Sequence, residues 1–192
     1  MQMEEQEKNK GVTFGFWIYL MTDLLMFAVL FATYSVLRNS TYSAITVREI
    51  FDPPFVLVET LLLLTSSFTC GLAMIATHAR NKEKAIWLLG ATIILGIIFL
   101  AMELYEFSHL ISEGNDWTKS AFLSSYFTLV GTHGLHILIG SSWIGLLLLQ
   151  IKRKGLTNSL VRKITLAGLF WHFLDVVWIF IFTIVYLMGG IS

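Results

Sequence analysis

Residues 131–140 read GTHGLHILIG and lie in the middle of an apolar run that extends from about residue 122 to residue 149. This run is long enough for a helix to cross the ~30 Å hydrocarbon layer of a bilayer. His133 and His136 are three residues apart, so on such a helix they share one face. Gly140 and Trp143 continue that face. Small residues, which let a second helix come close, recur along the same run: Gly131, Gly134, Ser141 and Gly145.

Four further apolar runs of similar length accompany this one. Hydrophobic residues make up 56% of the chain and charged residues 14%, whereas a soluble domain carries about a quarter charged residues. The sequence therefore predicts an all-α integral membrane protein, a bundle of five transmembrane helices in one domain at residues 14–192. A polar cytoplasmic tail is expected at residues 1–13. The expected spans are residues 14–36, 55–77, 85–106, 122–149 and 164–188.

Five spans place the two termini on opposite sides of the membrane. Ten of the 13 Lys and Arg residues then fall on the side of the N-terminus, and Arg38, Arg48 and Lys119 fall on the other. The positive-inside rule predicts a cytoplasmic N-terminus and a periplasmic C-terminus. The basic runs are short and lie beside membrane helices, so no nucleic-acid partner is expected. Four of these residues are candidates for contacts with anionic lipid headgroups: Arg80, Lys152, Arg153 and Arg162.

Asp23 lies inside the first expected span, roughly 14 Å deep at 1.5 Å per residue. A carboxylate at that depth costs several kcal/mol unless it is protonated, paired or directed at a polar interior. We therefore expect Asp23 to face the bundle. There it either ties two helices together through a hydrogen bond or handles protons in its own right.

Three glutamates lie towards the predicted outer boundary. Glu59 begins a stripe of small and polar residues that indicates a helix–helix seam, and at this level it can be partly hydrated. Glu103 and Glu106 share a face of the third span. Such a pair can act as general acid and base or bind a metal; alternatively, the two are interfacial acids that cap helices or pair with neighbours. The two stripes are Glu59, Leu63, Ser66, Cys70, Ala73 and Thr77, and Thr92, Gly96, Phe99, Glu103 and Glu106.

The fifth span combines a histidine and an acid in WHFLDVVW, residues 171–178, where His172 and Asp175 share a face. A haem or metal site needs ligands on facing helices, and only His172 is a credible partner for His133 or His136. The alternative is that these histidines are hydrogen-bonded at helix interfaces, because an unpaired polar group in hydrocarbon is expensive. Counting from the span boundaries predicts that four groups lie at similar depths and meet: Asp23, His133, His172 and Asp175.

Several other functions find little support in the residues. The single Cys70 rules out an intrachain disulfide and a cysteine-based metal cluster. The sequence supplies no nucleophile–base pair and no phosphate-binding glycine loop. Acids at mid-depth often line ion pathways, which keeps an independent proton or ion transporter open. However, the chain has no inverted repeat and no pair of broken spans, so five short-looped helices favour an accessory subunit.

Five segments together resemble subunit III of the haem–copper terminal oxidases, and the match covers every span. Within that family the chain is most similar to the versions of bacterial bo-type ubiquinol oxidases, which have five spans and an aspartate at the position of Asp23. Cytochrome c oxidase subunit III usually has seven helices and a glutamate there. The segments are FWIYLMTDLLMFAVLFATY (16–34), PFVLVETLLLLTSS (54–67), MELYEFSHLI (102–111), LVGTHGLHILIG (129–140) and LFWHFLDVVWIFIFTIVYLMG (169–189).

The resemblance implies a non-catalytic subunit of a complex that oxidises ubiquinol, reduces oxygen to water and pumps protons across the bacterial inner membrane. In that family subunit I holds the haems and copper, so no cofactor is expected in this chain. The subunit packs mainly against subunit I, with subunits II and IV in the complex, binds structural phospholipid and supports proton uptake.

Position by position, Asp23 matches the family's intramembrane acid. The other mid-span groups match its histidine and WHFxD motifs, with no catalytic role assigned: His133, His136, His172 and Asp175. Two alternatives stay open beside the oxidase subunit. One is a subunit III-like accessory protein of nitric oxide reductase, and the other is the independent transporter.

Overall fold

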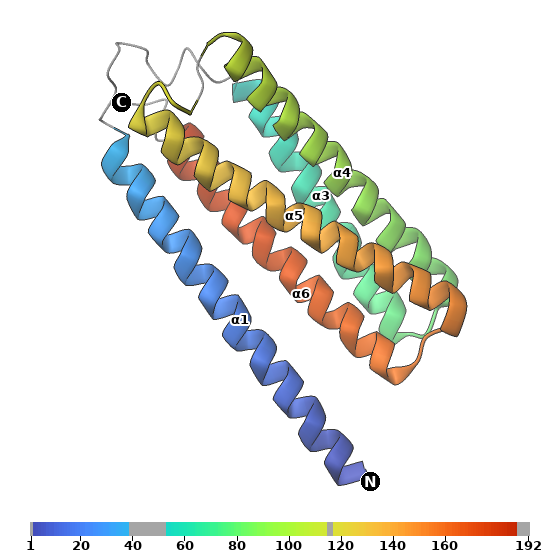
Figure 1. Ribbon diagram of the computed structural model, residues 1–192. Coiled ribbons are helices and arrows are strands. Elements are labelled where there is room, and N and C mark those ends of the chain that lie inside the picture. The colour runs from blue at the N-terminus through green and yellow to red at the C-terminus, as the bar shows by residue number, and fades with distance from the viewer. Residues whose placement is uncertain (1, 39–52, 115–116, 188–192) are drawn as a thin grey trace.

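The computed structural model describes residues 2–38, 53–114 and 117–187, and every regular element in these residues is helical (Figure 1). Five α-helices are followed by one π-helical stretch at the end of the last. The elements are α1 (Gln2–Leu37), α3 (Pro53–His78), α4 (Lys82–Ser112), α5 (Ala121–Lys154), α6 (Asn158–Ile181) and η1 (Phe182–Leu187).

All five helices are long and apolar enough to cross a membrane, which confirms the predicted five-span, all-α membrane protein. The boundaries differ at several ends. Helix α1 begins at Gln2, so the stretch predicted as a tail, residues 1–13, is helical from there on, while the candidate membrane span within the helix begins at Gly11. Helix α4 continues to Ser112, beyond the expected end at residue 106. Residue 188, the expected end of the last span, lies outside the described residues, as does Arg48 of the charge count.

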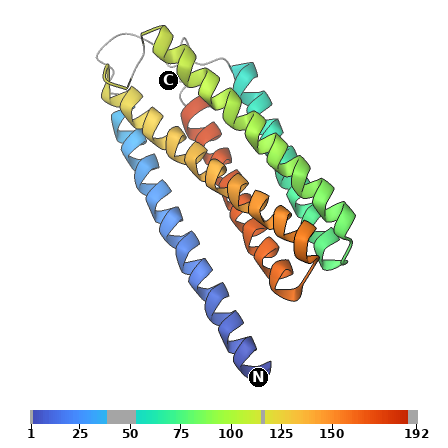
Figure 2. The ribbon, with the colours of Figure 1, turned by 45° about the vertical axis from the view of Figure 1, so that its right-hand side comes forward.

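The helices lie side by side, and each runs in the direction opposite to the one before it, so that the neighbours α1 and α6 are parallel (Figures 1 and 2). Helix α3 packs against α4 and α6, and α5 packs against α4 and α6, so these four close a ring. Helix α1 runs along one side of the ring, against α5 and α6. The short turn between α3 and α4 makes those two helices antiparallel neighbours, as predicted.

Side-chain caps define where three helices begin. The side-chain oxygens of Asn81, Ser120 and Thr157 accept hydrogen bonds from backbone N–H groups in the first turns of α4, α5 and α6. These residue types are preferred N-caps because they satisfy donors that the helix leaves unpaired. Helix α5 ends at Lys154 and is capped by Gly155, whose φ of 70° is a backbone conformation that glycine adopts readily.

All residues of the two predicted stripes are buried, and several of them, such as Ser66 and Gly96, contact α6 across the interior as well as lying on the helices that pack as the α3–α4 pair. Thr69 of α3 and Thr92 of α4 form a hydrogen bond of 2.9 Å across the seam. Cys70 is buried and free, as expected of a small packing residue.

Two glycines make room for the indole of Trp171 at the centre of the four-helix ring. A Cβ on Gly96 of α4 would lie 2.7 Å from Cη2 of Trp171, and one on Gly140 of α5 would lie 3.3 Å from the same indole. The Trp171 N–H donates to Ser66 Oγ at 3.0 Å. Of the other small residues predicted to let a second helix come close, Gly131 and Gly134 face α4, where an added Cβ would make an ordinary contact of 3.7 Å, whereas a Cβ on Gly145 would meet no described atom within 4 Å.

Two short turns are tied together at the end of the bundle where α1 begins. The Arg80 guanidinium, on a residue with φ of 59°, donates to the Leu156 carbonyl and the Asn158 side chain. Lys82 Nζ donates to the Lys152 carbonyl at 3.4 Å. The α3–α4 and α5–α6 turns, both rich in Lys and Arg, therefore lie at one end, as the charge count expected. That this end is cytoplasmic stays a prediction.

Candidate functional site

The polar residues singled out in the sequence fall into two groups. The carboxyl cluster comprises Glu59, Glu103 and Glu106, near the end of the bundle where α3 begins and α4 ends. The histidine–aspartate group lies between the helices nearer mid-bundle. All of these residues are buried except His136 and His172, which are partly exposed. The second group consists of Asp23, His133, His136, His172 and Asp175.

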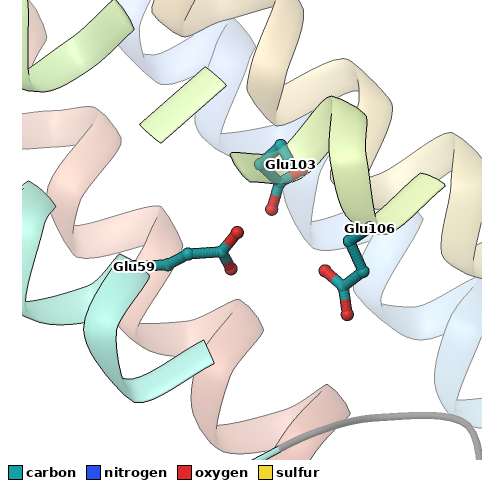
Figure 3. Close-up of side chains that lie close together, drawn as sticks. All are labelled: Glu59, Glu103 and Glu106. Carbon is teal, nitrogen blue, oxygen red and sulfur yellow. The ribbon is translucent and has the colours of Figure 1, made fainter. Parts of the chain in front are cut away.

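The carboxyl cluster brings together side chains from two helices. Glu59 projects from α3, and Glu103 and Glu106 project from successive turns of α4 into the same space (Figure 3). One oxygen from each carboxylate lies within 4.8 Å of the others. Glu59 is 0% exposed and Glu103 3%, so the expected partial hydration of Glu59 is wrong: the tight α3–α4 seam places this carboxylate inside the protein.

Two tyrosines extend the carboxyl cluster to the other helices. Tyr186 of η1 donates to Glu106 Oε2 at 3.2 Å, and its hydroxyl lies 3.0 Å from that of Tyr126 on α5. Both oxygens of Glu59 and Oε1 of Glu103 are buried without a hydrogen bond. Among the described residues, no Lys, Arg or His forms an ion pair with the three carboxylates. The expectation that these acids pair with neighbours therefore holds for Glu106, which accepts from Tyr186.

The sequence contained a signal that could have joined Glu59 to the other two. Glu59 lies 21 residues before Arg80, in the α3–α4 turn, and Glu103 lies 23 residues after it. In an antiparallel helix pair, residues equally far from the turn lie at the same level. The sequence interpretation treated Glu59 separately and missed this match.

Asp23 meets His136 across the α1–α5 interface. His136 Nδ1 lies 2.7 Å from the Thr132 carbonyl, and because a carbonyl only accepts, Nδ1 carries a hydrogen. Nε2 then faces Asp23 Oδ2 at 3.8 Å, within ion-pair range but too long for a hydrogen bond. Asp23 faces the bundle as predicted. Of the histidines it meets His136, not His133 or His172.

His172 contacts α3 and its own helix. Its Nδ1 lies 2.6 Å from Ser67 Oγ and 3.9 Å from Asp175 Oδ2. A catalytic Ser–His–Asp relay needs the serine and the aspartate on opposite ring nitrogens. Here both approach the same nitrogen, so the arrangement ties α6 to α3 and provides no activated nucleophile.

His133 is fully buried among aromatic rings. Its ring is stacked on Trp178, with centroids 5.3 Å apart, and lies 6.0 Å from Phe99 and 6.3 Å from Phe27. Neither nitrogen has a hydrogen-bond partner in the described structure, so the expected hydrogen bond is wrong for this residue. The three mid-span histidines thus have different neighbours. His133 lies among aromatic rings, Nε2 of His136 faces Asp23, and Nδ1 of His172 faces Ser67. This arrangement does not fit a haem held between facing histidines.

Two apolar grooves flank His172, and the sequence gave no indication of either. One, of about 440 Å³, runs between α1 and α6, and the other, of about 840 Å³, runs between α3 and α6. The first is lined almost entirely by hydrocarbon, a surface that suits an acyl chain. Its lining includes Trp17, Leu20, Leu24 and Phe31 of α1 and Phe173 and Val176 of α6.

The basic lipid-headgroup candidates lie at the end of the bundle with the two short turns. Arg80 is engaged with the α5–α6 turn, as described above. Arg153 is exposed. Arg162, in the second turn of α6, has a buried Nε without a hydrogen-bond partner in the described structure.

Comparison with known proteins gives one consistent result. Residues 3–190 match the family described as cytochrome c oxidase subunit III. Subunit 3 of the cytochrome bo(3) ubiquinol oxidase of Pseudomonas aeruginosa is 53% identical, over 96% of this chain and 88% of its own. Quinol oxidase subunit 3 of Bacillus subtilis is 47% identical over 96% and 91%. Cytochrome c oxidase subunit 3 of Bacillus sp. PS3 is 44% identical over 96% and 88%.

Proposed function

The chain belongs to the cytochrome c oxidase subunit III family, and we propose that it is the non-catalytic subunit III of a proton-pumping bo-type ubiquinol oxidase of the bacterial inner membrane. The complex would oxidise ubiquinol and reduce oxygen to water as part of the aerobic respiratory chain. The observation that carries this proposal is the 53% identity, over nearly the whole of both chains, to a relative named as such a subunit.

Two observations favour quinol over cytochrome c as the electron donor of the complex. Relatives named as quinol oxidase subunits reach 53% and 47% identity, above the one named for cytochrome c at 44%, and two others named for quinol stand just below it at 43% and 41%. The five-span architecture with Asp23 in the first span is the pattern that the sequence resemblance associates with quinol oxidases.

A non-catalytic role agrees with how the buried polar groups are used. Asp23–His136 joins α1 to α5, and Ser67–His172 joins α3 to α6. Polar contacts of this kind hold helices together in a membrane, because an unpaired polar group in hydrocarbon is expensive. Haems and copper then belong to subunit I, the main partner, with subunits II and IV in the same complex. Asp23 at the α1 interface would support proton uptake by subunit I.

A structural phospholipid fits the groove between α1 and α6. The apolar lining runs along α6 from Leu169 to Phe180 and would hold an acyl chain. Arg162 lies seven residues before Leu169, roughly 10 Å along the helix, towards the basic end. Its buried, unpaired Nε is a donor for a headgroup phosphate, and anionic headgroups favour such basic ends.

Co-purification from native membranes in mild detergent tests the proposed function. We expect this chain to bring down a haem–copper subunit that oxidises ubiquinol, and the chain produced alone to show no haem absorbance. A partner that reduces nitric oxide would favour the accessory protein of that system. Proton or ion transport by the isolated chain in liposomes, lost in Asp23→Asn, would favour the transporter. A stoichiometric haem on the isolated chain would contradict the non-catalytic role.

A further inference from the structure

We propose that the carboxyl cluster binds a divalent cation of the size of Ca²⁺. This inference goes beyond the proposed function and does not depend on it. Glu59 comes from one helix and Glu103 and Glu106 from another, and one oxygen of each lies within 4.8 Å of the others. All three point into a common space (Figure 3).

The unpaired state of Glu59 is the second observation that points to a ligand. Its carboxylate is 0% exposed, is directed into the space between Glu103 and Glu106, and has no hydrogen bond on either oxygen. A buried polar group without a partner costs ~1–3 kcal/mol, and more when it is charged. A cation between the three acids would satisfy Glu59 and the unpaired Oε1 of Glu103 together.

The charge of the cluster also calls for a cation. Three carboxylates at this distance repel one another strongly in a medium of low dielectric constant. No described basic side chain forms an ion pair with them. A divalent ion removes two of the three negative charges, and one shared proton removes the third. Without a cation, buried carboxyl groups avoid the cost of their charge by binding protons instead.

The donors and their spacing indicate the class of ion. The nearby ligating groups are all oxygens: three carboxylates, with the hydroxyl groups of Tyr126 and Tyr186 beside them. All-oxygen sites select hard cations such as Ca²⁺ or Mg²⁺ over metals that prefer nitrogen or sulfur. Mg²⁺ usually keeps several waters and is bound by one or two carboxylates, whereas Ca²⁺ accepts a larger set of protein oxygens. Three buried carboxylates with oxygens within 4.8 Å of one another therefore suit Ca²⁺ better.

Such an ion would clamp one end of the bundle. It would join the start of α3 to the end of α4 directly, and through Tyr186 and Tyr126 it would reach η1 and α5. The opposite end is already tied by Arg80. Since a ligand that binds only the folded state stabilises it, Ca²⁺ is expected to raise the thermal midpoint of the protein.

Terbium luminescence provides the test. Tb³⁺ replaces Ca²⁺ in oxygen sites and emits when nearby aromatic residues are excited, and Tyr126 and Tyr186 lie at the cluster. The full chain, purified in mild detergent with the subunits that accompany it, is titrated with Tb³⁺ under aromatic excitation. We expect saturable emission with one ion per chain, displaced by Ca²⁺ more readily than by Mg²⁺. The absence of saturable emission would overturn the proposal, and preferential displacement by Mg²⁺ would overturn the assignment to a Ca²⁺-sized ion.

Matched variants locate the site. Glu59→Gln keeps the shape of the side chain and is expected to weaken Tb³⁺ binding by roughly tenfold or more, because affinity depends on the number of charged ligands. Glu106→Gln should do the same, and it decides the question if Glu59→Gln does not accumulate. Glu113→Gln, at an exposed acid seven residues beyond Glu106, is the control and should bind as the unaltered protein does. Unchanged affinity in both cluster variants, or an equal loss in the control, would refute the site.

Discussion

Helices α3 to α6 and helix α1 are held in the bundle by different means. In the ring of four helices, the indole of Trp171 fills the space that two glycines leave on neighbouring helices, and its N–H is bonded to a third helix. Helix α1 contacts its neighbours through rings such as Phe27 and through the Asp23–His136 contact. Its outer face exposes large apolar side chains, among them Leu25 and Val29.

This difference indicates that the four-helix ring is complete in itself, whereas α1 depends on what surrounds it. The ring combines close packing with directional hydrogen bonds. In a membrane these two interactions hold helices together, because in lipid there is no hydrophobic driving force for helix association. Helix α1 makes the long Asp23–His136 contact and leaves an apolar groove beside α6. Lipid or a neighbouring subunit would complete its packing. Three substitutions test this comparison.

The largest loss is expected from Trp171→Ala, at the centre of the ring. It removes a fully buried indole and the hydrogen bond to Ser66, and should lower the free energy of unfolding in mild detergent by ~3–5 kcal/mol. The control is Trp87→Ala, because the Trp87 side chain is 81% exposed and should change stability by about 0.5 kcal/mol at most. Equal losses in both variants would show that the ring is not held by the buried indole.

An intermediate loss is expected from Gly96→Ala, where the added Cβ would meet Trp171 at 2.7 Å. Overpacking of this kind costs ~1–3 kcal/mol. Gly90→Ala on the same helix is the matched control, since a Cβ there meets nothing within 4 Å and alanine favours helix by up to ~1 kcal/mol. The two changes should therefore shift the thermal midpoint in opposite directions. A shift of the same sign would mean that the close approach of Gly96 is unimportant.

The smallest loss is expected from Asp23→Asn, at the α1 interface. The Asp23–His136 contact of 3.8 Å is longer than a hydrogen bond, so its removal should cost about 1 kcal/mol or less. The same change should weaken retention of α1 against the ring, measured as faster proteolysis within α1 while the remaining helices stay protected. A loss as large as that of Trp171→Ala would contradict the distinction between the two regions.

The sequence predicted the spans and their buried faces well, because both follow from local periodicity. The stripe that begins at Glu59 and the stripe that ends at Glu106 are both buried as expected. The predicted tail, residues 1–13, is helical from Gln2 because nothing in it breaks a helix that the apolar span has already started. The π-helical turn at Phe182–Leu187 carries no sequence signal that we recognise.

The partners of the buried groups were harder to predict, because they depend on how each helix is rotated. His133 and His136 share a face only loosely, since three residues leave them about 60° apart around the helix. That angle is enough to turn His133 into the ring of four helices and His136 towards α1. Counting residues gave comparable depths for Asp23 and the histidines, but depth alone could not choose among them.

The indole seated between Gly96 and Gly140 has a consequence for how this chain can diverge. A change of size at any one of these three positions is expected to lower stability unless another changes to compensate, because each occupies volume that the others leave free. Among descendants of a common ancestor, a methyl group gained at either glycine should be accompanied by a smaller ring at residue 171. Substitutions at these three positions are therefore expected to occur together during evolution, whereas substitutions at lipid-facing residues are expected to occur independently of one another.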